Sequence, residues 1–295
     1  MRTLLNTLKW AGEKKIALGH FNIAGFEQFK AVAETARELN LPVLIGVSEG
    51  ERNYLGVKQI RDLIASYNGE YGDQSNDDKF WIFLNADHTH DPALANEAAK
   101  NRFDEVLFDG GKLPLDENIT ETKSVVQMLK VTNPALLVEG EMGYIGSDSE
   151  IWDKIPEGAA LSPETLTKPE DAARFVSATG VDMLAPAVGN VHGMFRGGPD
   201  PRLDIARIKM IKDTVKIPLV LHGGSGTVDE DFTAAIEAGI SIIHISTEIR
   251  AAWRKGLEEG LRENPNEVAP YKIMPAAMKE MKVVIEERMK LFYRL

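Results

Sequence analysis

The chain has 295 residues, with 34 Lys and Arg against 45 Asp and Glu, for a formal net charge of −11. This acidic balance argues against a nucleic-acid partner, because phosphate backbones are bound by basic surfaces. The lack of cysteine excludes disulfides and thiolate-ligated metals. No apolar run approaches the roughly 18 residues of a membrane span, and the first residues show no signal-type core, so we expect a cytoplasmic protein without a membrane partner.

Eight short apolar segments alternate with longer segments of helical period. Their near-continuous apolarity is typical of strands buried on both faces, as in a parallel sheet. The eight segments are IALGHF from Ile16, PVLIGV from Pro42, FWIFLNA from Phe80, EVLF from Glu105, ALLVEG from Ala135, DMLAPA from Asp182, PLVLHG from Pro218 and SIIHIS from Ser241.

Eight helices are predicted between and after these strands, at residues 26–39, 57–67, 92–100, 115–130, 169–178, 204–214, 228–238 and 248–259. Pro92 and Pro169 stand in predicted first turns, where the missing N–H of proline is harmless. Eight strand–helix pairs predict an α/β fold of the TIM (β/α)8 barrel type. A doubly wound sheet would have fewer strands and a glycine fingerprint after the first, and none follows Phe21.

Two segments lie outside this repeat. Residues 141–168 form a long, mostly irregular insertion after the fifth strand, and such loops tend to be functional. A helical tail is expected from Pro275 to Leu295, packed on the barrel or on a second subunit. We expect a single domain over residues 1–295, with 260–295 as its C-terminal helical extension.

Potential metal ligands gather at the ends of the predicted strands. Barrel enzymes build their sites at the carboxyl ends of the strands, so these residues share one rim. A lone histidine is more often a core or surface residue than a ligand, whereas convergence of many favours a metal. The rim residues are His20, His88, His90, His192, His222, His244, Asp87, Asp109, Glu139 and Glu141.

Three stretches carry most of the chemical signal: LNADHTHD from Leu84, GNVHGMFRGG from Gly189 and PLVLHGGSG from Pro218. Each contributes one histidine that follows a different strand, namely His88, His192 and His222. Three imidazoles can hold Zn²⁺ and leave a position open for substrate. In HGGSG, backbone N–H groups and a hydroxyl at the start of a helix favour an anion, although the stretch is also explained as a tight turn.

With PVLIGVSEG and VEGEMG, these motifs resemble those of the class II, zinc-dependent ketose-bisphosphate aldolases, the family of fructose-bisphosphate and tagatose-bisphosphate aldolases. The resemblance runs from ALGHFN to Glu248. It implies reversible cleavage of a ketose phosphate, such as fructose 1,6-bisphosphate, to dihydroxyacetone phosphate and an aldehyde such as glyceraldehyde 3-phosphate. We expect Zn²⁺, a monovalent cation near the phosphate site, and a homo-oligomer, either a dimer or a tetramer.

The resemblance also implies roles for individual residues. His88, His192 and His222 would bind zinc, Glu141 would be an accessory metal ligand, and Asp87 would be the acid/base at the bond that breaks. The positions expected to face substrate or phosphate are Asn22, Ser48, Gly189, Gly193, Arg196, Gly223, Gly224, Ser225, Ser246 and Thr247.

Elementary chemistry agrees with these roles. Breaking a carbon–carbon bond beside a ketone leaves an enediolate, and none of the eight strand segments contains a lysine for a Schiff base. A metal must therefore polarise the carbonyl. A second acid has to exchange a proton on the three-carbon fragment, and the loop IGSDSEIWD offers Asp148 and Glu150.

The sequence departs from the family pattern at three places. The stretch after the fourth strand reads DGGKLPL where the family has DASHxPF, which keeps Asp109 but loses the serine and histidine. An asparagine of the first loop is replaced by Ala24. The strand-eight asparagine is replaced by His244, which we expect to donate to the enediolate, bind metal, or mark a changed substrate; a buried structural histidine is the simpler alternative.

Two other functions fit parts of the pattern. A metal-dependent epimerase or isomerase acting on sugar phosphates could use the same rim, and would form no cleavage products. A non-catalytic phosphosugar-binding subunit is suggested by the lost serine and histidine, but binding alone would not need Asp87 together with three metal-binding histidines.

Overall fold

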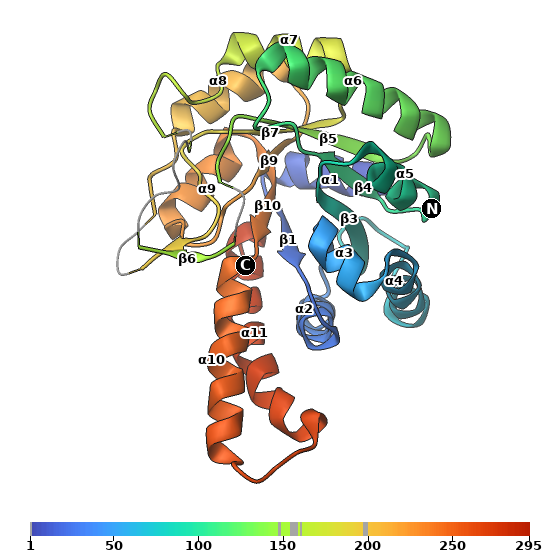
Figure 1. Cartoon of the computed structure of the whole chain (residues 1–295), viewed down its shortest axis with the longest axis vertical. Coiled ribbons are helices and arrows are strands. Elements are labelled where there is room, and N and C mark those ends of the chain that lie inside the picture. The colour runs from blue at the N-terminus through green and yellow to red at the C-terminus, as the bar shows by residue number, and fades with distance from the viewer. Residues whose placement is uncertain (1, 147–148, 154–158, 160, 197–199) are drawn as a thin grey trace.

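The computed structural model describes residues 2–146, 149–153, 159, 161–196 and 200–295. Its centre is a closed barrel of eight parallel strands in the order β1-β10-β9-β7-β5-β4-β3-β2 (Figure 1). Each strand coincides with one of the eight apolar segments, so the predicted TIM barrel is confirmed. The strands are β1 (Leu18–Asn22), β2 (Pro42–Val47), β3 (Trp81–Thr89), β4 (Glu105–Phe108), β5 (Leu137–Met142), β7 (Met183–Pro186), β9 (Leu219–Leu221) and β10 (Ile240–Ile245).

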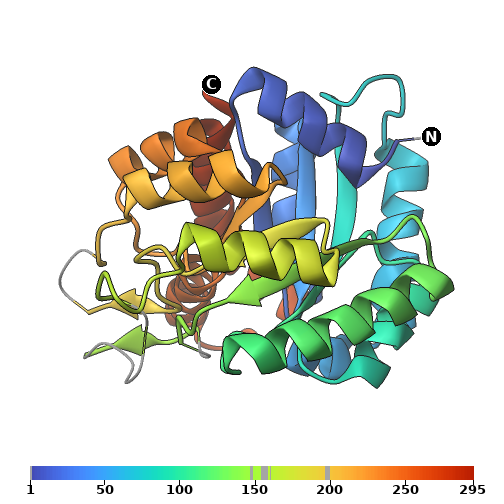
Figure 2. The same cartoon turned by 90° about the horizontal axis from the view of Figure 1, so that it is seen from above.

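Helices surround the strands (Figure 2). All eight predicted helices are present, with α4 and α10 running past their predicted ends, and two more, α1 and α3, were not predicted. The helices are α1 (Leu4–Lys14), α2 (Phe26–Leu39), α3 (Glu49–Leu55), α4 (Val57–Tyr71), α5 (Pro92–Lys100), α6 (Leu115–Thr132), α7 (Pro169–Thr179), α8 (Ile205–Val215), α9 (Asp229–Ala238), α10 (Thr247–Glu263) and α11 (Pro270–Tyr293). None of the described helices is long and apolar enough to cross a membrane.

Helix α3 begins in a capping box that the sequence contains but our prediction did not use. The Ser48 side chain accepts from the Glu51 N–H, and the Glu51 carboxylate accepts from the Ser48 N–H. This pairing satisfies two N–H groups that a helix start otherwise leaves free. It also anchors the Ser48 and Glu51 side chains beyond the carboxyl end of β2.

The C-terminal helix begins earlier than expected. Proline favours first turns, but the proline that starts α11 is Pro270, and Pro275 lies inside the helix. Helices α10 and α11 form a hairpin that extends away from the barrel (Figure 1). The last turn of α11 returns to the barrel, where the Phe292 carbonyl accepts from Ala17 N and the Tyr293 hydroxyl donates to Pro42 O. The tail is therefore packed on the barrel.

The insertion after β5 contains a strand of a short ladder. Two-residue strands β6 (Ile151–Trp152) and β8 (Met194–Phe195) pair in parallel, outside the barrel sheet. Trp152 Nε1 donates to His192 O at 2.7 Å. Gly193 adopts a φ of +97°, and a Cβ there would lie 1.8 Å from Trp152 Nε1, so only glycine allows this contact. The insertion is thus attached to the loop that carries His192.

Candidate active site

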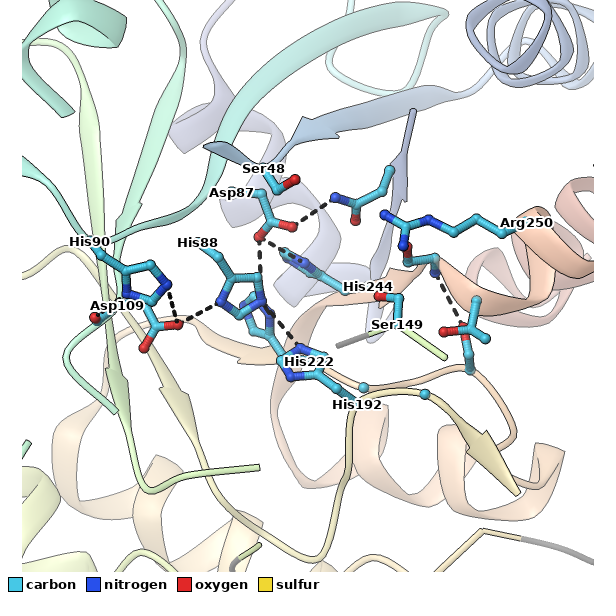
Figure 3. Close-up of a pocket in the computed structure, with 16 residues that line it drawn as sticks. Ser48, Asp87, His88, His90, Asp109, Ser149, His192, His222, His244 and Arg250 are labelled. Atoms are coloured by element: carbon cyan, nitrogen blue, oxygen red, sulfur yellow. Dashed lines mark hydrogen bonds and ion pairs between the residues drawn. The ribbon is translucent and has the colours of Figure 1, made fainter. Parts of the chain in front are cut away.

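The carboxyl ends of the barrel strands enclose a cavity of about 250 Å³ (Figure 3). It joins the histidine-rich rim on one side to the start of α10 on the other. The lining residues are Asn22, Ser48, Asp87, His88, His90, Asp109, Ser149, His192, Gly193, His222, Gly223, Ser225, His244, Ser246, Thr247 and Arg250. Most residues that the sequence placed at the site are therefore brought together here.

Three histidines point their ring nitrogens toward one another, as Figure 3 shows. His88 Nε2 lies 3.2 Å from His192 Nε2 and 3.2 Å from His222 Nδ1. A tetrahedral zinc ion with Zn–N bonds of about 2.0–2.1 Å needs donor atoms roughly 3.3–3.4 Å apart. Two of the three separations are close to this value and all three donor atoms lie within 4.8 Å of one another, so the triad fits a zinc ion or a similar divalent metal.

The second nitrogen of each ring is held by an acceptor. His88 Nδ1 donates to Asp109 Oδ2 at 2.8 Å, and His192 Nδ1 donates to Gly146 O at 2.7 Å. His222 Nε2 donates to Glu139 Oε1 at 2.9 Å. Such outer hydrogen bonds fix the tautomer, so that the inner nitrogen of each ring presents a lone pair to the metal.

The charges around the triad favour a cation. Burial lowers the pKa of His192 and of His222 to about 3, which keeps these rings neutral and able to bind metal. Burial acts in the same direction on His88, but Asp87, Asp109 and Glu141 outweigh it and raise the pKa of His88. Acidic groups thus stabilise positive charge at the point where the three rings meet.

Adjacent Asp87 and His88 both reach the cavity because β3 is irregular there. On a regular strand, neighbouring side chains point to opposite faces. The register of β3 against β4 shifts between Ala86 and Thr89, and His88 adopts a φ of +36°. This left-handed conformation at a non-glycine residue is strained, as is common at functional sites. The bulge therefore places an acid/base candidate and a metal-ligand candidate side by side.

Asp87 is a buried, oriented carboxylate. Asn22 Nδ2 donates to Asp87 Oδ2 at 2.8 Å, and His244 Nδ1 lies 3.6 Å from Asp87 Oδ1. Burial raises the pKa of Asp87, but the neighbouring histidines, His88 first, and the Asn22 amide hold it well below its usual range. Asp87 is therefore ionised at neutral pH and can accept a proton.

Glu141 lies on the far side of His88 from the other two histidines. Its Oε2 is 3.6 Å from His88 Nδ1, and Asp109 approaches the same nitrogen. His88, Asp109 and Glu141 form a second group whose ligand atoms lie within 4.8 Å of one another. Rotation of the His88 ring would be needed to present a lone pair to an ion here.

The cavity wall that continues from His192 and His222 contains the predicted anion-binding residues. Gly193, Gly223, Ser225, Ser246 and Thr247 line the cavity where α10 begins. The N-terminus of this long helix carries a partial positive charge that favours an anion. Ser225 Oγ accepts from the N–H groups of Ser246 and Glu248, which fastens the HGGSG turn to the helix start.

Three predicted substrate residues do not line the cavity. Gly189 packs against the Arg202 carbonyl, and the Gly224 N–H donates to His244 O behind the cavity wall. Arg196 is largely exposed and pairs with Asp153 at 2.7 Å. The two glycines therefore shape the turns, whereas Arg196 points away from the cavity.

Of the two loop acids, the structure describes only Glu150, which does not line the cavity. Glu150 is exposed, and its carbonyl accepts from Met194 N in the β6–β8 ladder. Asp148 lies outside the described residues. Ser149, next to Glu150, lines the cavity, so the loop reaches the site at this residue.

Sequence reasoning missed an ion pair at the cavity edge. Glu51 accepts from Arg250 Nη2 at 2.7 Å, from Asn22 Nδ2 at 3.1 Å and from Ser48 N at 2.7 Å. Glu51 therefore ties Arg250 to Asn22, the residue that orients Asp87. The Ser48–Glu51 capping spacing could have located the carboxylate, but Arg250 lies one turn inside a helix and carries no such signal.

Comparison with known proteins gives a consistent result. Residues 2–294 match the family model described as fructose-bisphosphate aldolase class-II. A fructose-bisphosphate aldolase of Geobacillus stearothermophilus is 32% identical, over 99% of this chain and 96% of the relative. A 6-phospho-5-dehydro-2-deoxy-D-gluconate aldolase of Bacillus licheniformis is 31% identical, over 97% of this chain and 92% of the relative.

Solved structures that resemble this fold include an aldolase. The crystal structure of the YdjI aldolase from Escherichia coli K12 is 26% identical and superimposes with a TM-score of 0.78, covering 99% of this chain and 97% of that one. The family implies a divalent metal and a phosphosugar substrate. The match to an aldolase family also decides against the two alternative functions, an epimerase or isomerase and a non-catalytic binding subunit. The chain belongs to the class II fructose-bisphosphate aldolase family and is a carbon–carbon lyase, a class II ketose-bisphosphate aldolase.

Proposed function

We propose that this enzyme catalyses zinc-dependent, reversible cleavage of fructose 1,6-bisphosphate to dihydroxyacetone phosphate and glyceraldehyde 3-phosphate. The observation that carries the proposal is the convergence of three imidazole nitrogens beside an ionised carboxylate, Asp87. The Geobacillus stearothermophilus relative supports this substrate. The Bacillus licheniformis relative supports a different phosphosugar almost equally, so 6-phospho-5-dehydro-2-deoxygluconate is the second candidate.

His88 Nε2, His192 Nε2 and His222 Nδ1 would hold the zinc ion, which when bound polarises the substrate ketone and stabilises the enediolate. Glu141, with Asp109, would provide a second, looser metal position, which His88 could join only after its ring rotates. The outer acceptors Asp109, Gly146 and Glu139 keep the three rings in the required tautomers.

Asp87 would move the hydroxyl proton at the bond that breaks. Its Oδ2 is occupied by the Asn22 amide, so Oδ1 remains to face the substrate hydroxyl. As an ionised group it takes this proton during cleavage and returns it during condensation. His244 lines the cavity beside it and would donate a hydrogen bond to the oxygen where negative charge develops.

A loop acid would exchange the proton on the three-carbon fragment. Glu150 and Asp148 are the candidates, and the exposed Glu150 side chain would have to turn toward the cavity to reach the substrate. Exchange of the C3 proton of dihydroxyacetone phosphate should slow in Glu150→Ala or in Asp148→Ala. Normal exchange in both variants would place this function elsewhere.

The phosphate of the three-carbon fragment would bind at Gly193, Gly223, Ser225, Ser246 and Thr247, at the N-terminus of α10. Asn22 and Ser48 would contact the sugar from the opposite wall. A monovalent cation beside the phosphate is part of this proposal. Its test is the dependence of the cleavage rate on K⁺ at constant ionic strength.

One set of assays tests the activity. Purified enzyme should cleave fructose 1,6-bisphosphate faster than tagatose 1,6-bisphosphate or 6-phospho-5-dehydro-2-deoxygluconate, with activity lost in chelator and restored by Zn²⁺. Faster cleavage of either competitor would reassign the substrate. Undiminished cleavage after verified metal removal would overturn the metal-dependent mechanism.

We also propose that the chain forms a homo-oligomer through the α10–α11 hairpin. Val268 and Tyr271, at the hairpin turn, are 88% and 76% exposed, an apolar surface on a projecting element. Sedimentation equilibrium should give a dimer or tetramer that weakens in the double variant Val268→Ser, Tyr271→Ser. A monomeric wild type would refute the proposal.

A further inference from the structure

Two buried histidines form a flat stack under the cavity. His20 on β1 and His244 on β10 are register partners on neighbouring strands, so both side chains enter the barrel at the same level. Their ring centroids are 3.4 Å apart and their planes differ by 7°. His20 is 0% exposed and does not line the cavity, whereas His244, at 4%, does. Only His244 is therefore in a position to touch a substrate.

The stack is enclosed by further residues of the barrel. The His222 ring lies 3.8 Å from that of His244, centroid to centroid, at a 40° tilt. On the β2 side, a Cβ at Gly46 would lie 2.0 Å from His20 Cε1 and 2.3 Å from His20 Nε2. The ring of His20 thus occupies space that only a glycine on β2 leaves free.

Hydrogen bonds do not fix the His244 ring. Neither nitrogen of His20 or of His244 has a partner among the described residues, and the Asp87 Oδ1 that faces His244 has none either. The χ2 torsion of histidine has a broad energy profile, so a ring without hydrogen bonds can swing about it. Contact with a flat ring restricts that swing, and His20 supplies the parallel contact, at 3.4 Å, beside the tilted His222 ring.

We propose that His20 is a positioning residue, which by stacking holds the plane of His244 so that its edge faces Asp87 and the substrate. This inference rests on the proposed role of His244 in cleavage. A metal site is the competing explanation, because ligand atoms of His20, Asp87 and His244 lie within 4.8 Å of one another. The lone pairs of two parallel rings point side by side rather than toward one point, as a shared metal ion would require. The geometry therefore favours a positioning role for His20 over a metal site.

The test compares His20→Leu, which fills similar space without a flat face, with His20→Phe, which keeps one. His20→Leu should lower kcat about tenfold with little change in KM, and His20→Phe should recover most of the loss. In a His244→Asn background, His20→Leu should change kcat less than about twofold, because coupled residues lose their coupling when one is removed. Equal losses in both backgrounds would overturn the proposal.

Crystal structures decide the point even where a variant is inactive. The His244 ring should turn from its wild-type plane in His20→Leu and keep it in His20→Phe. An unchanged ring in His20→Leu would contradict positioning, and loss of a second bound metal equivalent in that variant would establish the metal site instead. Failure of these tests in an enzyme that still cleaves its substrate with zinc would leave the proposed function intact.

Discussion

The barrel mouth holds two groups of histidines that are fixed in opposite ways. In the triad, an outer acceptor holds one nitrogen of each ring, so the tautomer is set and the inner nitrogen is free for metal. In the His20–His244 stack, no nitrogen meets hydrogen-bond geometry with a partner among the described residues, and the parallel contact of the rings sets their planes, with Asp87 Oδ1 3.6 Å from His244 Nδ1. Hydrogen bonding thus prepares a ring to be a ligand, whereas stacking leaves its nitrogens available to a substrate.

The sharpest test of this contrast removes one ring from each group. His88→Ala, His192→Ala and His222→Ala should each bind well under one zinc per chain and lose activity to background. His244→Ala should keep one zinc and lose about 10²–10³ in kcat, as expected when one donor to a developing negative charge is removed. His244→Asn, with one amide donor, is the matched control and should keep much of the activity. Elemental analysis beside steady-state kinetics gives both readouts, and undiminished zinc in all three triad variants would refute the ligand assignment.

Asp87 lies between the two groups and should matter for the reaction rather than for binding. Asp87→Asn keeps the shape and the contact with Asn22 but cannot accept the substrate proton. We expect a loss of about 10²–10⁴ in kcat with near-normal zinc content and KM. A variant that turns over at close to the wild-type rate would remove Asp87 from the acid/base role.

Glu139 tests whether the outer acceptors matter to the triad. Glu139→Ala should weaken zinc affinity by about 10–100-fold, because His222 loses the acceptor that fixes its tautomer. Glu139→Gln should weaken it less, since the amide oxygen still accepts from His222 Nε2. Competition with a chelator of known affinity measures both, and equal affinities in all three proteins would show that the outer shell is dispensable.

Burial of His20 in the stack should make the free energy of unfolding depend on pH. Burial lowers the pKa of His20 to about 4, below its usual value near 6.5, so between these values the unfolded chain binds the extra proton. The contribution of the neutral His20 ring to the free energy of unfolding is therefore complete above pH 6.5 and falls as the pH drops toward 4. Between pH 7 and pH 5 the loss should be about 2 kcal/mol, and it should be missing in His20→Phe. Urea unfolding of the metal-free proteins at both pH values measures it, and parallel pH slopes would contradict the assignment.

The fold was predictable because eight buried parallel strands leave eight continuous apolar runs, and the strand ends then identified the rim. The expectation that barrel sites lie at strand ends also predicted that Asp87 and His88 share one site, although the regular alternation of side chains on a strand would have separated them. A β-bulge, with His88 at positive φ, allows both side chains to reach the site. That backbone shift has no signature in the residue types themselves.

The rest of the site depends on contacts that sequence does not encode locally. The ion pair of Glu51 and Arg250 joins residues 199 positions apart, and the stack of His20 on His244 joins the first and last barrel strands. Arg196 was expected at the phosphate but pairs with Asp153, because the β6–β8 ladder brings these two side chains together. Motif matching assigns a residue to a loop but not the direction in which its side chain leaves that loop.

The attachment of the insertion to His192 has a thermodynamic consequence. The His192 N–H donates to Ile145 O, its ring donates to Gly146 O, and its carbonyl accepts from Trp152, so the insertion supplies every one of these bonds. Order in the insertion and metal affinity at His192 are therefore linked, and linkage is reciprocal. Whatever free energy a bound metal contributes to ordering the insertion, an ordered insertion contributes equally to holding the metal. A ligand that favours the hydrogen bonds between the insertion and His192 would thereby also raise the affinity of the site for the ion.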